Sequence, residues 1–165
     1  NKKDNSGTTA FQYAVYKNNI NIVKYLLKYN REYLNNTLNL NNIACNGNSP
    51  LIDACYNLNC DMISLLLENN IDMYTRDSNG NSPLHYLIYY IEDYDYLYST
   101  QHKEKYLLKI IKLFLKYGFD LNTRNNYGDT VGDLIVHFGY LDKIKKYTDI
   151  YKLEFNKITR SGQKY

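Results

Sequence analysis

The feature that most constrains this chain is a short motif that recurs four times. Each copy is a glycine, any residue, and then serine or threonine, followed by a small residue or proline. The glycines are Gly7, Gly47, Gly80 and Gly128, so successive copies are 40, 33 and 48 residues apart. A unit of 33 residues with insertions of 7 and 15 residues accounts for all three gaps. Such a period indicates a repeat protein whose units pack on their neighbours.

The agreement continues inside the units. Val23 and Ile63 each lie nine residues after an alanine, Ala14 or Ala54. Paired apolar residues follow at Leu26-Leu27, Leu66-Leu67 and Phe114-Leu115. Apolar residues spaced in this way form one stripe on a helix of period 3.6. A helix pair with one apolar side needs neighbours to cover it, so the sequence predicts a stack of helical units.

Residues of the motif also predict where helices begin and end. Ser49 and Ser82 are placed to cap helices that start at Pro50 and Pro83, where the missing N–H costs nothing. The motif glycines suit a tight turn with positive φ. Asparagine also tolerates that conformation. The residues expected to follow the second helix of a repeat are Asn30, Asn70 and Gly118.

This pattern resembles the ankyrin repeat, with Gly-x-Thr-Pro-Leu-His-x-Ala early, Ile-Val-x-x-Leu-Leu later and Gly-Ala-Asp-x-Asn at the end. The best matches are Ser82-Pro83-Leu84-His85 and Gly118-Phe119-Asp120-Leu121-Asn122. The resemblance covers roughly residues 4–147 and implies an all-α solenoid of paired antiparallel helices with β-hairpin-like fingers. It also implies that His85 hydrogen-bonds to neighbouring repeats. The first and fourth units depart from the pattern, with Ala10-Phe11-Gln12 and Val131-Gly132-Asp133.

We therefore expect one domain over residues 1–165. The expected repeats are 4–36, 44–76, 77–124 and 125–147, with insertions within 31–43 and 91–108. We interpret the first insertion as a longer loop, and expect the second to project between the two helices of the third repeat. Lysines around Ile144 are typical of a terminal repeat that faces water. Residues 148–165 would form a capping helix or begin a further element.

Composition and motifs argue against several functions. The net charge of +3 is too small to indicate a nucleic-acid partner, and no apolar run approaches the length of a membrane span. The lysines between Lys103 and Lys116 alternate with apolar residues, as on the solvated face of an amphipathic helix. Neither the cysteines nor the histidines have metal-site spacing, and no phosphate loop or nucleophile motif occurs. We expect no catalysis, cofactor or metal.

The resemblance places the first helix of each repeat, together with the fingers, on the inner face of the stack. Six of nine positions expected to be exposed there are tyrosine, although tyrosine makes up 20 of 165 residues. Tyrosine offers a large contact area with little rotamer entropy. The expected partner-binding residues on the helices are Tyr13, Tyr16, Lys17, Asp53, Tyr56, Asn57, Tyr86, Tyr89 and Tyr90. Those expected at the finger tips include Arg76, Arg124 and Tyr127.

The sequence thus predicts a non-catalytic module that binds a protein or peptide. One alternative is that the tyrosines only cover neighbouring helices. Two others are a regulatory domain of a larger enzyme or channel and, less favoured, a nucleic-acid-binding solenoid that uses Lys103 to Lys116. The chain begins at Asn1 without a methionine, so we expect it to be part of a longer protein. We also expect a monomer in an intracellular, cytoplasmic setting.

Overall fold

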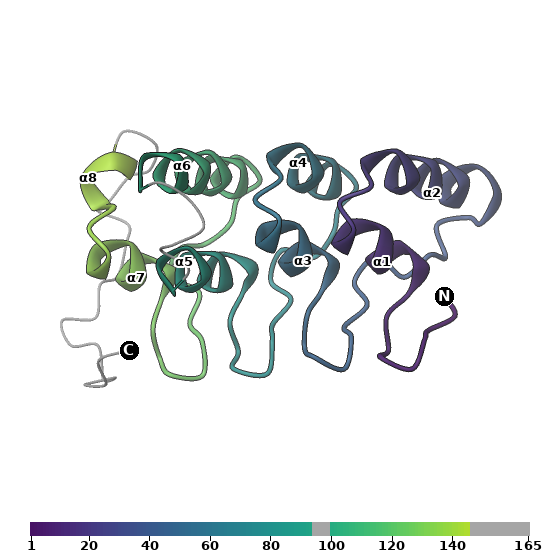
Figure 1. Cartoon of the computed structure of the whole chain (residues 1–165), viewed down its shortest axis with the longest axis horizontal. Coiled ribbons are helices and arrows are strands. Elements are labelled where there is room, and N and C mark those ends of the chain that lie inside the picture. The colour runs from purple at the N-terminus through teal and green to yellow at the C-terminus, as the bar shows by residue number, and fades with distance from the viewer. Residues whose placement is uncertain (94–99, 146–165) are drawn as a thin grey trace.

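A computed structural model of the chain describes residues 1–93 and 100–145. Within these ranges the chain forms eight helices in two parallel rows, with loops projecting from one side (Figure 1). One row holds the first helix of each repeat and the other holds the second. The pairs are α1 (Ala10–Tyr16) with α2 (Ile20–Tyr33), α3 (Pro50–Tyr56) with α4 (Cys60–Glu68), α5 (Pro83–Asp93) with α6 (Thr100–Lys116), and α7 (Val131–His137) with α8 (Leu141–Ile144). The predicted all-α solenoid is confirmed.

The loops before the first helices are the fingers, and all four close in the same way. In the first, Gly7 N donates to Asp4 O at 3.0 Å and Asp4 N donates to Thr8 O at 3.0 Å. The same two bonds recur around the other three motif glycines. The φ angles of the four glycines lie between 73° and 86°, a region that side chains with a Cβ rarely adopt. The predicted turns are confirmed.

The predicted helix starts are also confirmed. The Ser49 side chain accepts from Ile52 N, and Pro50 is the first residue of α3. Ser82 Oγ accepts from His85 N at 3.5 Å, and α5 begins at Pro83. Threonines cap the other two first helices in the same manner. Each cap satisfies an amide that the first helical turn leaves without a partner.

The ends of the second helices agree with the sequence in two of three repeats. Asn70 and Gly118 follow α4 and α6 with φ of 56° and 82°. The prediction for Asn30 is wrong, because α2 continues to Tyr33. Asn30 lies inside the helix and is 4% exposed, and its Oδ1 accepts from Leu38 N at 2.8 Å. The first insertion therefore starts as an extra helical turn and not as a loop.

The second insertion also lengthens helices. Helix α5 has 11 residues, whereas α1, α3 and α7 have 7 each, and α6 has 17 residues. Residues 91–93 and 100–108 are helical, so the projecting loop expected there is wrong for these residues. Ile91 and Leu107 are 3% and 0% exposed, and this burial explains the added turns. The rest of this insertion, and the expected cap at 148–165, lie outside the described residues.

The core lies between the two rows of helices. Val23, Ile63 and Ile111 occupy equivalent positions on α2, α4 and α6, and each is 0% exposed. On α8, Ile144 is buried and Lys143 is exposed, and Lys145, which follows the helix, is exposed.

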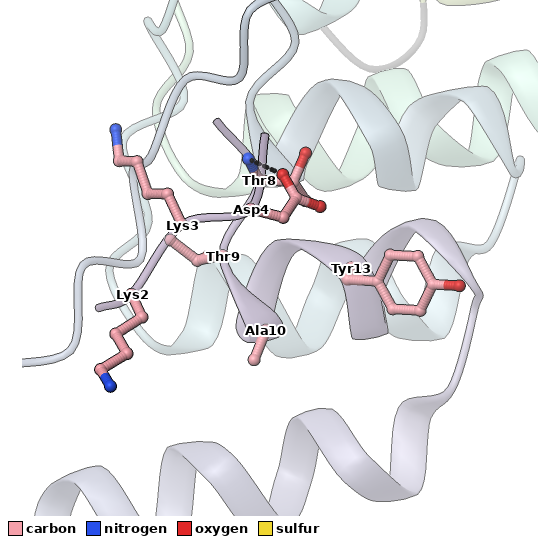
Figure 2. Close-up of a pocket in the computed structure, with 7 residues that line it drawn as sticks. All are labelled: Lys2, Lys3, Asp4, Thr8, Thr9, Ala10 and Tyr13. Atoms are coloured by element: carbon pink, nitrogen blue, oxygen red, sulfur yellow. Dashed lines mark hydrogen bonds between the residues drawn. The ribbon is translucent and has the colours of Figure 1, made fainter. Parts of the chain in front are cut away.

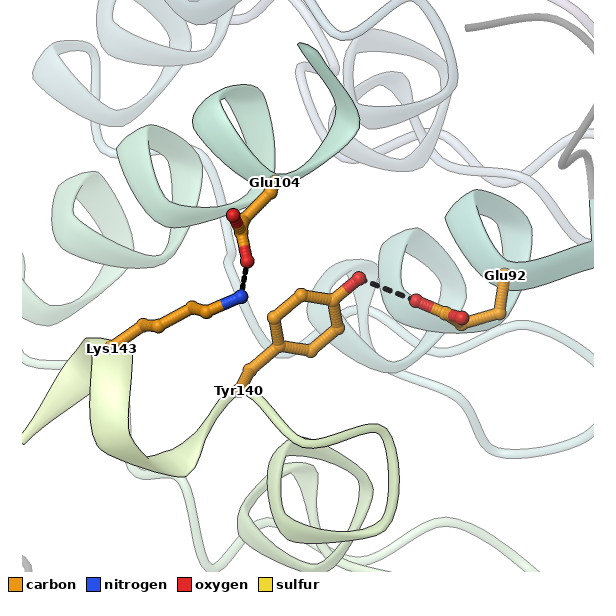
Figure 3. Close-up of polar contacts among 4 residues, drawn as sticks. All are labelled: Glu92, Glu104, Tyr140 and Lys143. Atoms are coloured by element: carbon orange, nitrogen blue, oxygen red, sulfur yellow. Dashed lines mark hydrogen bonds and ion pairs between the residues drawn. The ribbon is translucent and has the colours of Figure 1, made fainter. Parts of the chain in front are cut away.

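Two of the polar contacts that join the fourth repeat to the third lie beside α8 (Figure 3). Tyr140 OH, beside α8, donates to Glu92 Oε1 of α5 at 2.5 Å. Lys143 forms an ion pair with Glu104 of α6. Because Glu92 and Glu104 belong to the lengthened helices, the second insertion supplies both contacts.

Candidate interaction surface on the inner helices

Helices α1, α3 and α5, called the inner helices here because the ankyrin resemblance places them on the inner face, carry tyrosine at one equivalent position. Tyr16, Tyr56 and Tyr89 each lie seven residues after the N-cap of their helix. Tyr16 and Tyr56 are 47% and 41% exposed, and Tyr89 is half-buried. The repeat period thus brings these side chains to the same place on successive units.

An aromatic cluster joins the second and third repeats. The rings of Tyr56 and Tyr90 lie 4.7 Å apart between centroids, and those of Tyr86 and Tyr90 lie 6.2 Å apart and nearly parallel. Aromatic pairs at such distances contribute about 0.5–1.5 kcal/mol beyond their buried area. The structure therefore brings three of the predicted residues together, and their packing holds Tyr56 in place while part of its ring remains exposed.

Tyr89 makes contacts with the fourth repeat. Its hydroxyl donates to Asp129 Oδ2 at 3.3 Å, and Asn125 Nδ2 lies 3.5 Å from the same hydroxyl. Both partners belong to the fourth finger. The alternative that the tyrosines cover neighbouring helices is instead supported by the contact of Tyr56 on α3 with Tyr90 on α5.

Tyr13 and Lys17 lie on the first repeat. Tyr13 is 52% exposed, and Lys17 Nζ lies 5.5 Å and 5.2 Å from the ring centroids of Tyr13 and Tyr16. At exposed sites such cation–π contacts contribute about 0.5–1 kcal/mol. The lysine charge is thus held beside two tyrosine rings.

Asp53 does not lie on the open surface, so the expectation that it is exposed is wrong. It is 4% exposed, because Gln12 of the first repeat covers it. Its carboxylate accepts from Gln12 Nε2 at 3.0 Å and from Asn48 Nδ2 at 3.2 Å. Burial raises the pKa of Asp53, and the two hydrogen bonds oppose that shift. Asn57 is half-buried, and its Nδ2 donates to Tyr16 O at 2.9 Å.

Arg76 and Arg124 form hydrogen bonds to finger carbonyls in addition to carrying positive charge. Arg76 Nη1 donates to Gly80 O at 2.7 Å, and Arg124 Nη1 donates to Gly128 O at 2.9 Å. Arg76 also donates to the carbonyl of Arg124, which links the third and fourth fingers. Their equivalence in consecutive repeats is confirmed, and both remain exposed. Tyr127, at the tip of the fourth finger, is 47% exposed.

One polar residue that the sequence argument passed over joins two repeats. Gln12 Nε2 donates to Asn48 O of the next repeat at 2.8 Å. In the third repeat, His85 Nε2 bonds to the equivalent carbonyl, Asp129 O, at 3.0 Å, while its Nδ1 lies 2.7 Å from Ser82 Oγ. The implied inter-repeat role of His85 is thus present in the structure. The sequence feature that could have predicted this role for Gln12 is its position, three residues after the N-cap, where the third repeat has histidine.

The described residues also bear on the other expected features. They contain no group of three or more His, Cys, Asp or Glu side chains able to hold a metal ion, and no helix long and apolar enough to cross a membrane. Burial raises the pKa of both the Cys55 and the Cys60 thiol. Four of the expected lysines are exposed on α6, as on a solvated helix face. They are Lys105, Lys109, Lys112 and Lys116.

Family models match most of this architecture. The model for ankyrin repeats in three copies matches residues 31–125, and the model for a single ankyrin repeat matches residues 6–37. The chain belongs to the ankyrin repeat family. An ankyrin repeat protein of Fowlpox virus (strain NVSL) is 37% identical over 87 residues, which cover 50% of this chain and 16% of the relative. Ankyrin repeats are in general protein–protein interaction modules, typically without catalytic activity of their own.

Proposed function

We propose that this chain is a non-catalytic recognition module that binds a protein or peptide across its inner helices. The observation that carries the proposal is the pair of exposed rings of Tyr16 and Tyr56, with Tyr56 packed in a cluster with Tyr86 and Tyr90. Tyr16 and Tyr56 occupy equivalent positions one repeat apart and keep 47% and 41% of their surface exposed. A partner lying along the stack would meet both rings.

The packing of these rings favours binding. Tyr56 lies against Tyr90, which in turn lies against Tyr86, so the conformation of the exposed ring is partly fixed before a partner arrives. Ordering a free side chain on association costs about 0.5–1.5 kcal/mol, and a ring already held in place avoids part of that cost. Tyrosine is also enriched among the residues that dominate binding energies.

The fingers would form the second edge of this surface. Tyr127 is exposed at a finger tip, and the guanidinium groups of Arg76 and Arg124 lie one repeat apart. These positive groups suit acidic or carbonyl-rich segments of a partner. The proposed partner is accordingly a protein segment with apolar or aromatic side chains beside acidic ones.

A selection from a phage library of random peptides tests the proposal. Peptides enriched on the wild-type chain are synthesised, and their affinities are measured by fluorescence anisotropy. Replacing Tyr16 and Tyr56 together by alanine should weaken binding at least tenfold, because both rings lose their contact area.

The matched control replaces two exposed tyrosines of the outer helices, Tyr25 and Tyr106, which are 65% and 37% exposed. This variant should bind as the wild type does. Equal affinity of both variants, or a selection that enriches no peptide, would contradict the proposal. Circular dichroism of both variants checks that the helices remain formed.

The monomeric state and the cytoplasmic setting stay predictions. Sedimentation equilibrium tests the first, and imaging of the tagged protein in cells tests the second. The alternative role as the regulatory domain of a larger enzyme or channel depends on the rest of the polypeptide. Retention on immobilised DNA or RNA that falls steeply with salt would instead support the nucleic-acid alternative.

A further inference from the structure

The side of the first repeat that faces away from the second exposes positions that the second repeat buries. Tyr13 and Ile22 are 52% and 48% exposed, whereas their equivalents in the second repeat, Asp53 and Met62, are 4% and 0% exposed. Ala10 is exposed too, although its equivalent Pro50 is buried. In the second repeat these positions face the repeat before it, as the contact between Asp53 and Gln12 shows. The first repeat therefore exposes to solvent the surface that the second repeat uses to pack on its preceding repeat.

A hollow of about 430 Å³ lies on this face, between the first finger and α1 (Figure 2). Figure 2 shows it lined on the finger side by Lys2, Lys3, Asp4 and Thr8, and on the helix side by Thr9, Ala10 and Tyr13.

The equivalent place in the second repeat is filled by a side chain of the first. Three residues there form hydrogen bonds with the Gln12 side chain. They are Asn42, Asn48 and Asp53, at 2.7 Å, 2.8 Å and 3.0 Å. With the offset of 40 residues between the two units, these correspond to Lys2, Thr8 and Tyr13. All three line the hollow. The hollow thus has the position of a socket for a side chain from a preceding repeat.

The finger carbonyls on this face can be compared between equivalent positions of the repeats. Asn48 O accepts from Ala44 N and from Gln12, and Asp129 O accepts from Asn125 N and from His85. Thr8 O, the equivalent carbonyl in the first repeat, accepts from Asp4 N and from no other donor among the described residues.

The second helices of the first and second repeats also differ in the hydrogen bonds of their N-cap residues. Asn59 and Asn19 both cap their helices through Oδ1. Asn59 Nδ2 also donates to Asn18 of the preceding repeat at 2.6 Å, whereas within the described residues Asn19 Nδ2 has no partner. Thr8 O and Asn19 Nδ2 are thus left available where the joint between the first and second repeats uses the equivalent groups, Asn48 O and Asn59 Nδ2.

We propose that this face is covered by a further ankyrin-type repeat that precedes Asn1 in the same polypeptide. A donor side chain equivalent to Gln12 or His85 would enter the hollow and bond to Thr8 O. The chain enters the stack at this end, so a preceding repeat would need no long linker (Figure 1). The Fowlpox virus relative, of which the match covers 16%, has ample length for further repeats.

Thiol labelling tests this proposal. Ile22→Cys is made in a Cys45→Ser background, which removes the exposed native thiol and leaves the two buried ones. The matched control is Tyr127→Cys, because Tyr127 is 47% exposed and Ile22 is 48% exposed. The rate of reaction with a maleimide is measured in the 165-residue chain and in the natural polypeptide that includes the residues before Asn1.

We expect both thiols to react at similar rates in the 165-residue chain. In the longer polypeptide the Ile22→Cys thiol should react at least tenfold more slowly, and the Tyr127→Cys thiol should be unchanged. An unchanged rate at position 22, or a reading frame with no repeat before Asn1, overturns the proposal. Protection of position 22 that grows with the concentration of the 165-residue chain identifies a second copy as the occupant, and also overturns it.

Discussion

Gln12 and His85 perform the same task with different chemistry. Each lies three residues after the N-cap of an inner helix, and each bonds through a side-chain nitrogen to the finger of the next repeat, at 2.8 Å to Asn48 O and 3.0 Å to Asp129 O. Both side chains are buried, at 1% and 0% exposed. The joint between the first and second repeats and that between the third and fourth thus use a side-chain donor at this position, which need not be an imidazole ring.

This equivalence predicts which substitutions of His85 the fold tolerates. His85→Gln should change the free energy of unfolding by less than about 1 kcal/mol, because glutamine supplies the same donor. His85→Leu should cost about 1–3 kcal/mol, because it leaves buried polar groups without partners. Urea unfolding followed by circular dichroism measures both values. Equal losses in the two variants would contradict the shared role.

His85 also predicts a pH dependence. Burial lowers the pKa of His85 from 6.5 to about 4, and the hydrogen bond to Asp129 O opposes the shift. Between these values the unfolded chain binds a proton that the folded chain does not, so stability falls as the pH falls from 6.5 to 4. The loss is at most about 3 kcal/mol.

His85→Gln isolates this effect, because glutamine does not titrate. The raised pKa values of Asp53 and Asp129 act in the opposite sense, and they are present in both proteins. The difference in unfolding free energy between wild type and variant should therefore change with pH between 6.5 and 4 and be constant above 7. A difference that is independent of pH would count against a buried neutral His85.

Two glycines offer a matched test of the finger packing. Gly80 and Gly128 have φ of 73° and 86°, so alanine at either position costs roughly 1–2 kcal/mol of backbone strain. A Cβ on Gly80 would also lie 2.9 Å from Asn126 N, whereas a Cβ on Gly128 meets nothing within 4 Å. Gly80→Ala should therefore lower the urea midpoint clearly more than Gly128→Ala. Equal shifts would mean that the two fingers do not pack as described.

The repeat itself was predictable because each unit satisfies the same local rules. A glycine turn, a Ser or Thr cap and proline at the helix start act over a few residues, so Gly47, Ser49 and Pro50 were sufficient to predict where α3 begins. The errors arose where contacts outside the repeated motif decide the outcome. Asn30 resembles a helix end by its position, but its side chain bonds to Leu38 N and the helix continues.

The candidate surface was predictable in part for the same reason. The period predicts that Tyr16 and Tyr56 are equivalent, and both are exposed. It does not predict that Gln12 covers Asp53, because that contact joins residues 41 positions apart. Nor does it predict that the guanidinium groups of Arg76 and Arg124 bond to finger carbonyls.

The last repeat should depend on the contact between Tyr140 and Glu92. Tyr140→Phe removes a hydrogen bond to a carboxylate in a half-buried setting, and should cost about 1–3 kcal/mol. Amide hydrogen exchange should then accelerate in residues 131–145 more than in α3 or α4. Tyr106→Phe, at an exposed tyrosine of α6, is the control and should leave exchange unchanged. Uniform acceleration along the whole chain would show that Tyr140 has no local role.

The most direct measurement of the proposed function is hydrogen exchange of the chain with and without a selected peptide. Binding across the inner helices predicts slower exchange in α1, α3, α5 and the fingers, centred on the segments that contain Tyr16 and Tyr56. Exchange in α2, α4 and α6 should be little changed. Protection confined to those outer helices would contradict the assignment of the inner face as the recognition surface.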